Sequence, residues 1–178
     1  MIGDGRARRA VAVGAPLAVA ALAYSLWWIS DRLVYIGPFD RATFGWAMVV
    51  PVWLATPFVA ALVWRSLSSR ATLEAAGLVG VIVTGVAAVL LWRAVAYPGC
   101  ENGAIRTSSE WVLPSLLIGA VVGGGIAASG LVAVRVLRAG PPVWAVVAGA
   151  TTSFVTIFVA IAMFAMVASG PACQRPPV

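Results

Sequence analysis

Few residues of this 178-residue chain could take part in acid, base or redox chemistry. Two pairs of carboxylates, Asp31 with Asp40 and Glu101 with Glu110, are weak candidates for metal binding or proton transfer, because they lie between the apolar segments rather than within them. The chain has no histidine and no lysine, which excludes a Ser-His-Asp triad, a His-ligated haem and a Schiff base. It also lacks a Gly-x-x-x-x-Gly-Lys phosphate loop. We therefore expect a protein that is not an enzyme and has no cofactor or metal.

The two cysteines, Cys100 and Cys173, are the residues of this chain that could take part in thiol–disulfide chemistry. Both fall on the same side of the membrane in the topology derived below, outside the cytoplasm, where disulfides form. We expect a structural disulfide between them. Free thiols or a redox pair are the alternatives, although the chain has no Cys-x-x-Cys motif to support a dithiol site.

Arg93 is the only charged residue inside an apolar segment, about one turn before Tyr97. A long arginine side chain can extend to the headgroup region from such a position, and we expect it to do so. The alternatives are an ion pair with one of the four loop carboxylates, or contact with an anionic headgroup or substrate.

These residues must be positioned by membrane helices. Of the 178 residues, 62% are hydrophobic and 10% are charged, too few polar side chains to cover a water-soluble domain. Five apolar runs are long enough to cross a bilayer, and backbone groups in lipid must be paired within a helix. The sequence predicts an all-α bundle of about five transmembrane helices in a single membrane domain, 1–178. The expected helices cover residues 10–30, 44–64, 75–97, 111–134 and 143–168.

The arginines indicate the orientation of this bundle, because cytoplasmic segments are enriched in basic residues. With the N-terminus inside, the inner segments hold seven arginines and two carboxylates, whereas the outer segments hold five arginines and four carboxylates. We expect the N-terminus inside, the C-terminus outside and the first helix retained rather than cleaved as a signal peptide. The excess of arginine is then explained by lipid headgroups rather than by nucleic acid. The composition favours a bacterial plasma membrane.

Tryptophans near the predicted helix ends are typical of aromatic belts, which anchor helices at the headgroup level. Trp27, Trp28 and Trp92 would lie at the outer interface, and Trp64 and Trp144 at the inner one. We interpret all of them as belt residues. A cage for an aromatic ligand is the alternative.

Small residues recur at intervals of four in the last three helices, which places them on one helix face where backbones can approach closely. The clearest series is Ser115, Gly119, Gly123 and Ala127, extended by the run of three glycines at 123–125. Glycine lowers helix propensity, so a close contact or a flexible point is needed to explain these positions. The expected packing positions are Gly80, Gly119, Gly123 and Gly149.

These features support two hypotheses about function. The first is an accessory or assembly subunit that packs against partner membrane proteins or a second copy of itself. The second is a small transporter or channel subunit that works as an oligomer or with a separate ATPase, supported by Pro51 and Pro57 within the second helix and by hydroxyls at 151–153 and 156 in the fifth. A static bend and ordinary backbone hydrogen bonds explain those features equally well. An enzyme that acts on lipid through the loop carboxylates and Arg93 is a weaker third idea.

Overall fold

The computed structural model describes residues 3–32, 41–95 and 111–168, and all regular structure in these ranges is helical. The five helices are α1 (Gly3–Arg32), α2 (Arg41–Trp64), α3 (Ser69–Val95), α4 (Val112–Ala139) and α5 (Pro142–Ala168). Several extend past the apolar runs of the sequence, because arginine is a good helix former and continues the helix into the polar region.

The prediction of an all-α, membrane-type bundle is confirmed. Four helices contain stretches long and apolar enough to cross a bilayer: Gly5–Ile29, Ser69–Arg93, Val112–Ala139 and Pro142–Val167. The apolar part of α2 that the structure describes in full, Val49–Trp64, is shorter.

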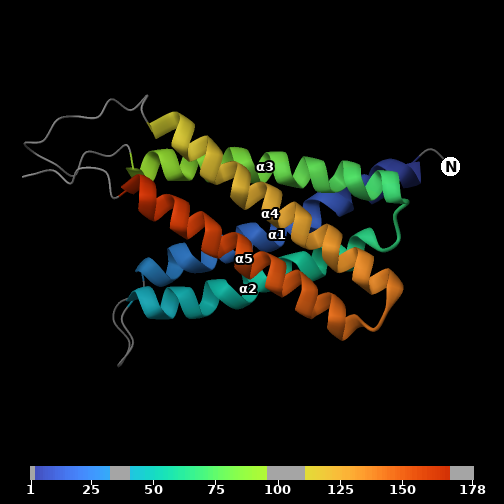
Figure 1. Ribbon diagram of the computed structural model, residues 1–178. Coiled ribbons are helices and arrows are strands. Elements are labelled where there is room, and N and C mark those ends of the chain that lie inside the picture. Colours follow the sequence, from blue (N-terminus) through green and yellow to red (C-terminus); the bar gives the residue numbers. More distant parts are fainter. Residues whose placement is uncertain (1–2, 33–40, 96–110, 169–178) are drawn as a thin grey trace, which may run out of the picture.

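The helices pack as neighbours in a compact bundle (Figure 1). The most extensive contacts join α3 to α4, α1 to α2 and α4 to α5, and α2 also contacts both α4 and α5. As a result α4 holds the most enclosed of these four spans. Half of its span is buried, compared with 11% of the α5 span. The start of α1, the α2–α3 turn and the α4–α5 turn lie at the same end of the bundle, here called the N-terminal end.

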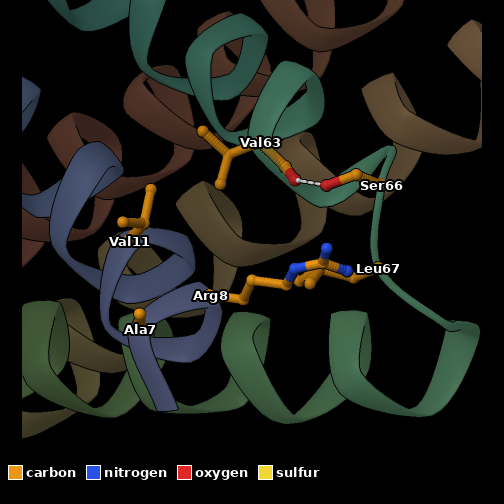
Figure 2. Close-up of a pocket in the computed structure, with 6 residues that line it drawn as sticks. All are labelled: Ala7, Arg8, Val11, Val63, Ser66 and Leu67. Carbon is orange, nitrogen blue, oxygen red and sulfur yellow. Dashed lines mark hydrogen bonds between the residues drawn. The ribbon is translucent and has the colours of Figure 1, made fainter. Parts of the chain in front are cut away.

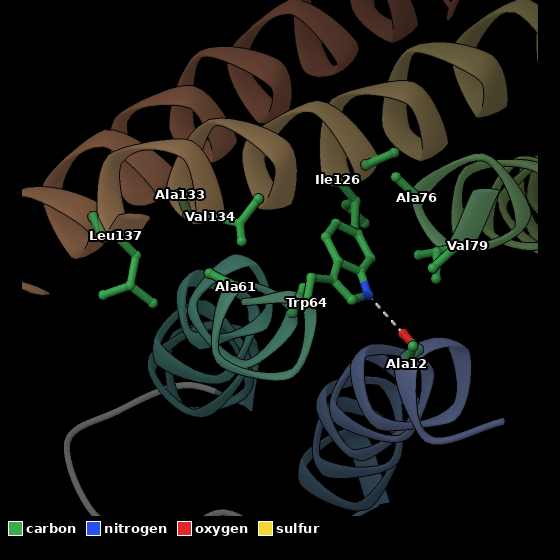
Figure 3. Packing of buried hydrophobic residues seen from close by; sticks show 13 residues of the cluster. Ala12, Ala61, Trp64, Ala76, Val79, Ile126, Ala133, Val134 and Leu137 are labelled. Carbon is green, nitrogen blue, oxygen red and sulfur yellow. Dashed lines mark hydrogen bonds between the residues drawn. The ribbon is translucent and has the colours of Figure 1, made fainter. Parts of the chain in front are cut away.

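Small side chains form most of the core (Figure 3). Its buried residues are mainly alanines from all five helices, joined by a few branched side chains and one large one, Trp64. In lipid, apolar area gives little preference for helix–helix contact over helix–lipid contact, so close approach of backbones and dispersion attraction hold such a bundle together. An alanine-rich core permits this close approach.

Candidate functional site

Trp64, the last residue of α2, joins three other helices at the N-terminal end. Its indole Nε1–H donates a hydrogen bond of 2.8 Å to the carbonyl oxygen of Ala12 in α1 (Figure 3). Its ring lies against α4 so closely that a Cβ added to Gly130 would be 2.6 Å from the ring atom Cζ3. Only a glycine at position 130 leaves space for this ring.

The interpretation of Trp64 as an interfacial belt residue is therefore wrong, because its side chain is fully buried. The belt interpretation fits Trp144 better, whose side chain is 62% exposed. The two tryptophans look alike in sequence because each lies beside a polar helix end. They differ in the helix face that they occupy, and the local sequence does not reveal which face meets α4.

The carbonyl oxygen of Trp64 also takes part in a polar contact between α2, α3 and α4. Arg138, in the last turn of α4, donates from Nη2 to the carbonyl oxygens of Trp64 (3.0 Å) and Leu67 (2.7 Å), and lies 3.3 Å from Thr72 Oγ1 in α3. The last carbonyls of a helix have no partner within it, so a guanidinium that binds them caps the helix. Sequence reasoning assigned Arg138 only to the charge balance, since nothing in the local pattern indicates a partner 74 residues away.

The α2–α3 turn is fixed from its α3 side as well. The Ser68 hydroxyl accepts a hydrogen bond of 3.3 Å from the backbone N–H of Ala71, as an N-cap residue does, and Thr72 Oγ1 lies 2.9 Å from the Ser68 carbonyl oxygen. Together with Arg138, these bonds hold the short turn between two long helices in one conformation.

The N-terminal end carries most of the positive charge that the structure describes. The arginines there are all exposed: Arg6, Arg8, Arg9, Arg65, Arg70, Arg135 and Arg138. Glu74 is paired with Arg70 at 3.3 Å, four residues earlier on the exposed surface of α3. This end is therefore a basic surface that surrounds the ordered α2–α3 turn.

Two of the glycines expected to mediate packing lie against the backbone of α3. A Cβ on Gly119 would be 2.7 Å from the carbonyl oxygen of Thr84 and 3.0 Å from the backbone nitrogen of Ala88. A Cβ on Gly123 would overlap the carbonyl oxygen of Gly80 and the hydroxyl of Thr84. At these two positions α3 and α4 are packed with no space for a side chain on α4.

The other two expected packing glycines also lie at helix contacts. Gly80 faces α4, but a Cβ there would be 3.4 Å from the Ala127 Cβ, an ordinary van der Waals separation. Gly149 of α5 lies where three helices meet, since its added Cβ would be 3.1 Å from Ala133 of α4 and 3.3 Å from Pro57 of α2. Gly80 is thus the more tolerant of the two positions.

The three consecutive glycines of α4 have three different environments. Gly123 faces α3, and Gly125 faces α5, where an added Cβ would overlap the side chain of Thr156. Gly124 has nothing within 4 Å of its added Cβ. It lies between two exposed alanines, Ala120 and Ala128, in a stripe of small residues on the outer face of α4. Helix packing within the bundle therefore explains Gly123 and Gly125 but not Gly124.

Of the remaining predicted site residues, Arg93 is the one that the structure describes. Arg93 lies in the last turn of α3 and is exposed. Cys100 and Cys173 lie outside the described residues, as do the side chains of the four carboxylates considered as partners for Arg93. The disulfide and the role of Arg93 stay predictions.

Two of the four hydroxyl groups of α5 bond to their own helix. Thr152 donates to the carbonyl of Ala148 and Thr156 to that of Thr152, at 2.8 and 2.9 Å. Ser153 differs, because its hydroxyl is buried and has no hydrogen-bond partner within the described part of the chain; the same is true of the indole nitrogen of Trp53 in α2. No group of three or more metal-ligating side chains occurs among the described residues.

Comparison of the chain with models of protein families, with curated proteins and with solved structures finds no match.

Proposed function

We propose that this chain is a non-catalytic subunit of a bacterial plasma membrane that packs against another membrane-spanning helix through the outer face of α4. The observation that carries the proposal is Gly124. In a helix interior, glycine is less favourable than alanine by about 1 kcal/mol, and within the bundle nothing approaches this position.

The neighbours of Gly124 support the proposal. Ala120, Gly124 and Ala128 are exposed at spacings of four, so they share one face and form a strip of small side chains along α4. Small residues at this spacing let a second helix approach closely enough for dispersion contacts and weak Cα–H hydrogen bonds. The partner is either another membrane protein or a second copy of this chain.

Replacing Gly124 with leucine should leave the monomer folded, because the new side chain enters open space. It should abolish co-purification of a stoichiometric partner, or dissociate a homo-oligomer, in mild detergent. The matched control is Gly77→Leu, which also places a leucine in open space but on α3. Loss of assembly in both variants, or in neither, would refute a contact at the outer face of α4.

We also propose that all five helices cross the membrane with the N-terminus in the cytoplasm and the C-terminus outside. The 24 residues of α2 span about 36 Å at 1.5 Å per residue, longer than a hydrocarbon core of about 30 Å. The basic N-terminal end agrees with a cytoplasmic location. In this topology Cys100 and Cys173 share the oxidising side, where a disulfide between them would form.

Reporter fusions after Val178 test this topology. A phosphatase that folds only outside the cytoplasm should be active there, whereas a fluorescent protein that matures only in the cytoplasm should remain dark. A bright fluorescent fusion with an inactive phosphatase would mean an even number of crossings or the opposite orientation.

A transporter or channel subunit is the second candidate, and the buried polar atoms of Trp53 and Ser153 favour it. Gly149 contacts Pro57, and α2 and α5 run in opposite directions, so Trp53 and Ser153 each lie one turn from that contact toward the same end of the bundle. Buried polar groups without partners are uncommon and call for a function or a bound water. A homo-oligomer with ion or solute flux that Ser153→Ala changes would favour this candidate over the first.

A further inference from the structure

An open pocket of about 220 Å³ lies at the N-terminal end between the first turns of α1 and the α2–α3 turn (Figure 2). It is lined by Ala7, Arg8, Val11, Val63, Ser66 and Leu67. Apolar side chains thus form most of its wall, and a single guanidinium is the charged group among its lining residues. In Figure 2, Val11 and Val63 lie on one side of the pocket, whereas the Arg8 side chain extends beside Leu67.

The charges around this pocket favour an anion. Among the described residues no carboxylate lines it, and Glu74, the acidic side chain that the structure describes at this end, is paired with Arg70. Arg65 follows directly after α2, and Arg138 binds the carbonyl oxygen of Leu67, one of the lining residues. The guanidinium of Arg8 therefore lines the pocket and other arginines lie at the same end of the bundle, and together they attract negative charge.

We infer that this pocket binds one anionic phospholipid, with the headgroup phosphate on Arg8 and an acyl chain against Val11 and Val63. Arginine has five N–H donors in a planar fork that matches two phosphate oxygens, so it can bind a phosphate while other donors contact the protein. The apolar wall continues from the charged group toward the hydrocarbon region, as a lipid requires and a free phosphate does not.

The rigidity of the turn makes the pocket a preformed site. Arg138 caps α2 from one side of the turn, and Ser66 Oγ donates to the carbonyl of Val63 at 3.1 Å (Figure 2). The side of the pocket that the α2–α3 turn forms is thus held in place without the lipid, which reduces the entropy lost on binding.

Native mass spectrometry of the full chain in a neutral detergent tests this site, with dioleoyl phosphatidylglycerol, dioleoyl phosphatidylcholine and inorganic phosphate as probes. We expect one phosphatidylglycerol to bind at least about tenfold more tightly than phosphatidylcholine. Arg8→Gln should weaken this binding about tenfold or more, as expected for loss of hydrogen bonds to a charged group. Arg135→Gln removes the same charge from an exposed position outside the pocket and should weaken binding less than about fivefold.

Val11→Trp provides an independent test because it keeps the charge and fills the pocket. Val11 is 57% exposed, so the bundle should tolerate the larger ring, which a melting curve would verify. Phosphatidylglycerol binding should fall, and millimolar inorganic phosphate should not compete. Equal losses of phosphatidylglycerol binding in Arg8→Gln and Arg135→Gln would show that diffuse surface charge, and not the pocket, attracts the lipid. Displacement of the lipid by phosphate, or unchanged binding in Val11→Trp, would overturn the lipid site.

Discussion

Replacing Gly123 with leucine is expected to prevent α3 and α4 from packing in their native arrangement. The first atom of the new side chain would already overlap the carbonyl oxygen of Gly80 and lie 2.7 Å from the backbone nitrogen of Thr84. Backbone atoms cannot turn aside as the end of a flexible side chain can, so the two helices would have to separate along the most extensive contact of the bundle. We expect a loss of at least about 3 kcal/mol, at the upper end of typical overpacking costs.

The measurement is thermal unfolding of the purified protein in detergent, followed by size-exclusion chromatography. Two matched variants separate a local clash from a general effect of losing a glycine. Gly80→Ala lies on the facing helix, where the added Cβ would be 3.4 Å from the Ala127 Cβ, and should be close to neutral. Gly77→Leu is the same substitution at a position of α3 where the added Cβ meets open space, and it should melt like the wild type. Wild-type stability of Gly123→Leu would show that α3 and α4 do not approach this closely.

Trp64→Ala is the second substitution with a large expected effect. It removes the largest buried side chain of the core, leaves a cavity beside Gly130 and deprives the Ala12 carbonyl of its indole donor. Such truncations destabilise water-soluble proteins by about 3–5 kcal/mol, and we expect a value of about 3 kcal/mol here because lipid can partly replace the lost contacts.

Trp64→Phe distinguishes packing from hydrogen bonding at the same position. Phenylalanine keeps an aromatic ring against α4 but has no N–H group, so this variant should lose only about 1 kcal/mol. Trp144→Ala is the control for tryptophan removal at the same end, since that side chain is largely exposed, and it should have little effect on melting. Equal effects of Trp64→Ala and Trp144→Ala would contradict the buried position of Trp64.

The architecture was predictable from sequence because one physical rule dominates it. A long apolar run must fold into a helix in lipid, and the runs that form α1, α3, α4 and α5 are long and nearly free of charge. The spacing of four between Gly119 and Gly123 indicated a packing face for a similarly local reason. Glycine is costly in a helix, so its repetition on one face indicates that something lies close by.

The partner of each face was not predictable. In a water-soluble bundle the core-facing side of a helix is more apolar than the opposite side, but in this chain both sides are apolar, since one meets protein and the other meets lipid. Local pattern therefore could not separate Gly123, which contacts α3, from Gly124, which contacts nothing within the bundle. For the same reason it could not distinguish the buried Trp64 from the exposed Trp144.

The cap on α2 has a consequence for the order in which the chain assembles during synthesis. Arg138 follows Trp64 by 74 residues, so at about 5–20 residues per second the ribosome makes the guanidinium about 4–15 s after the carbonyls that it binds. For most of that interval, until Gly130 is made 66 residues after Trp64, the ring of Trp64 has no Gly130 to pack against, although α1 and α2 can already pair through the Trp64–Ala12 hydrogen bond. The nascent protein therefore passes through stages of two and then three helices with an incompletely covered tryptophan, and only the emergence of α4 completes the site.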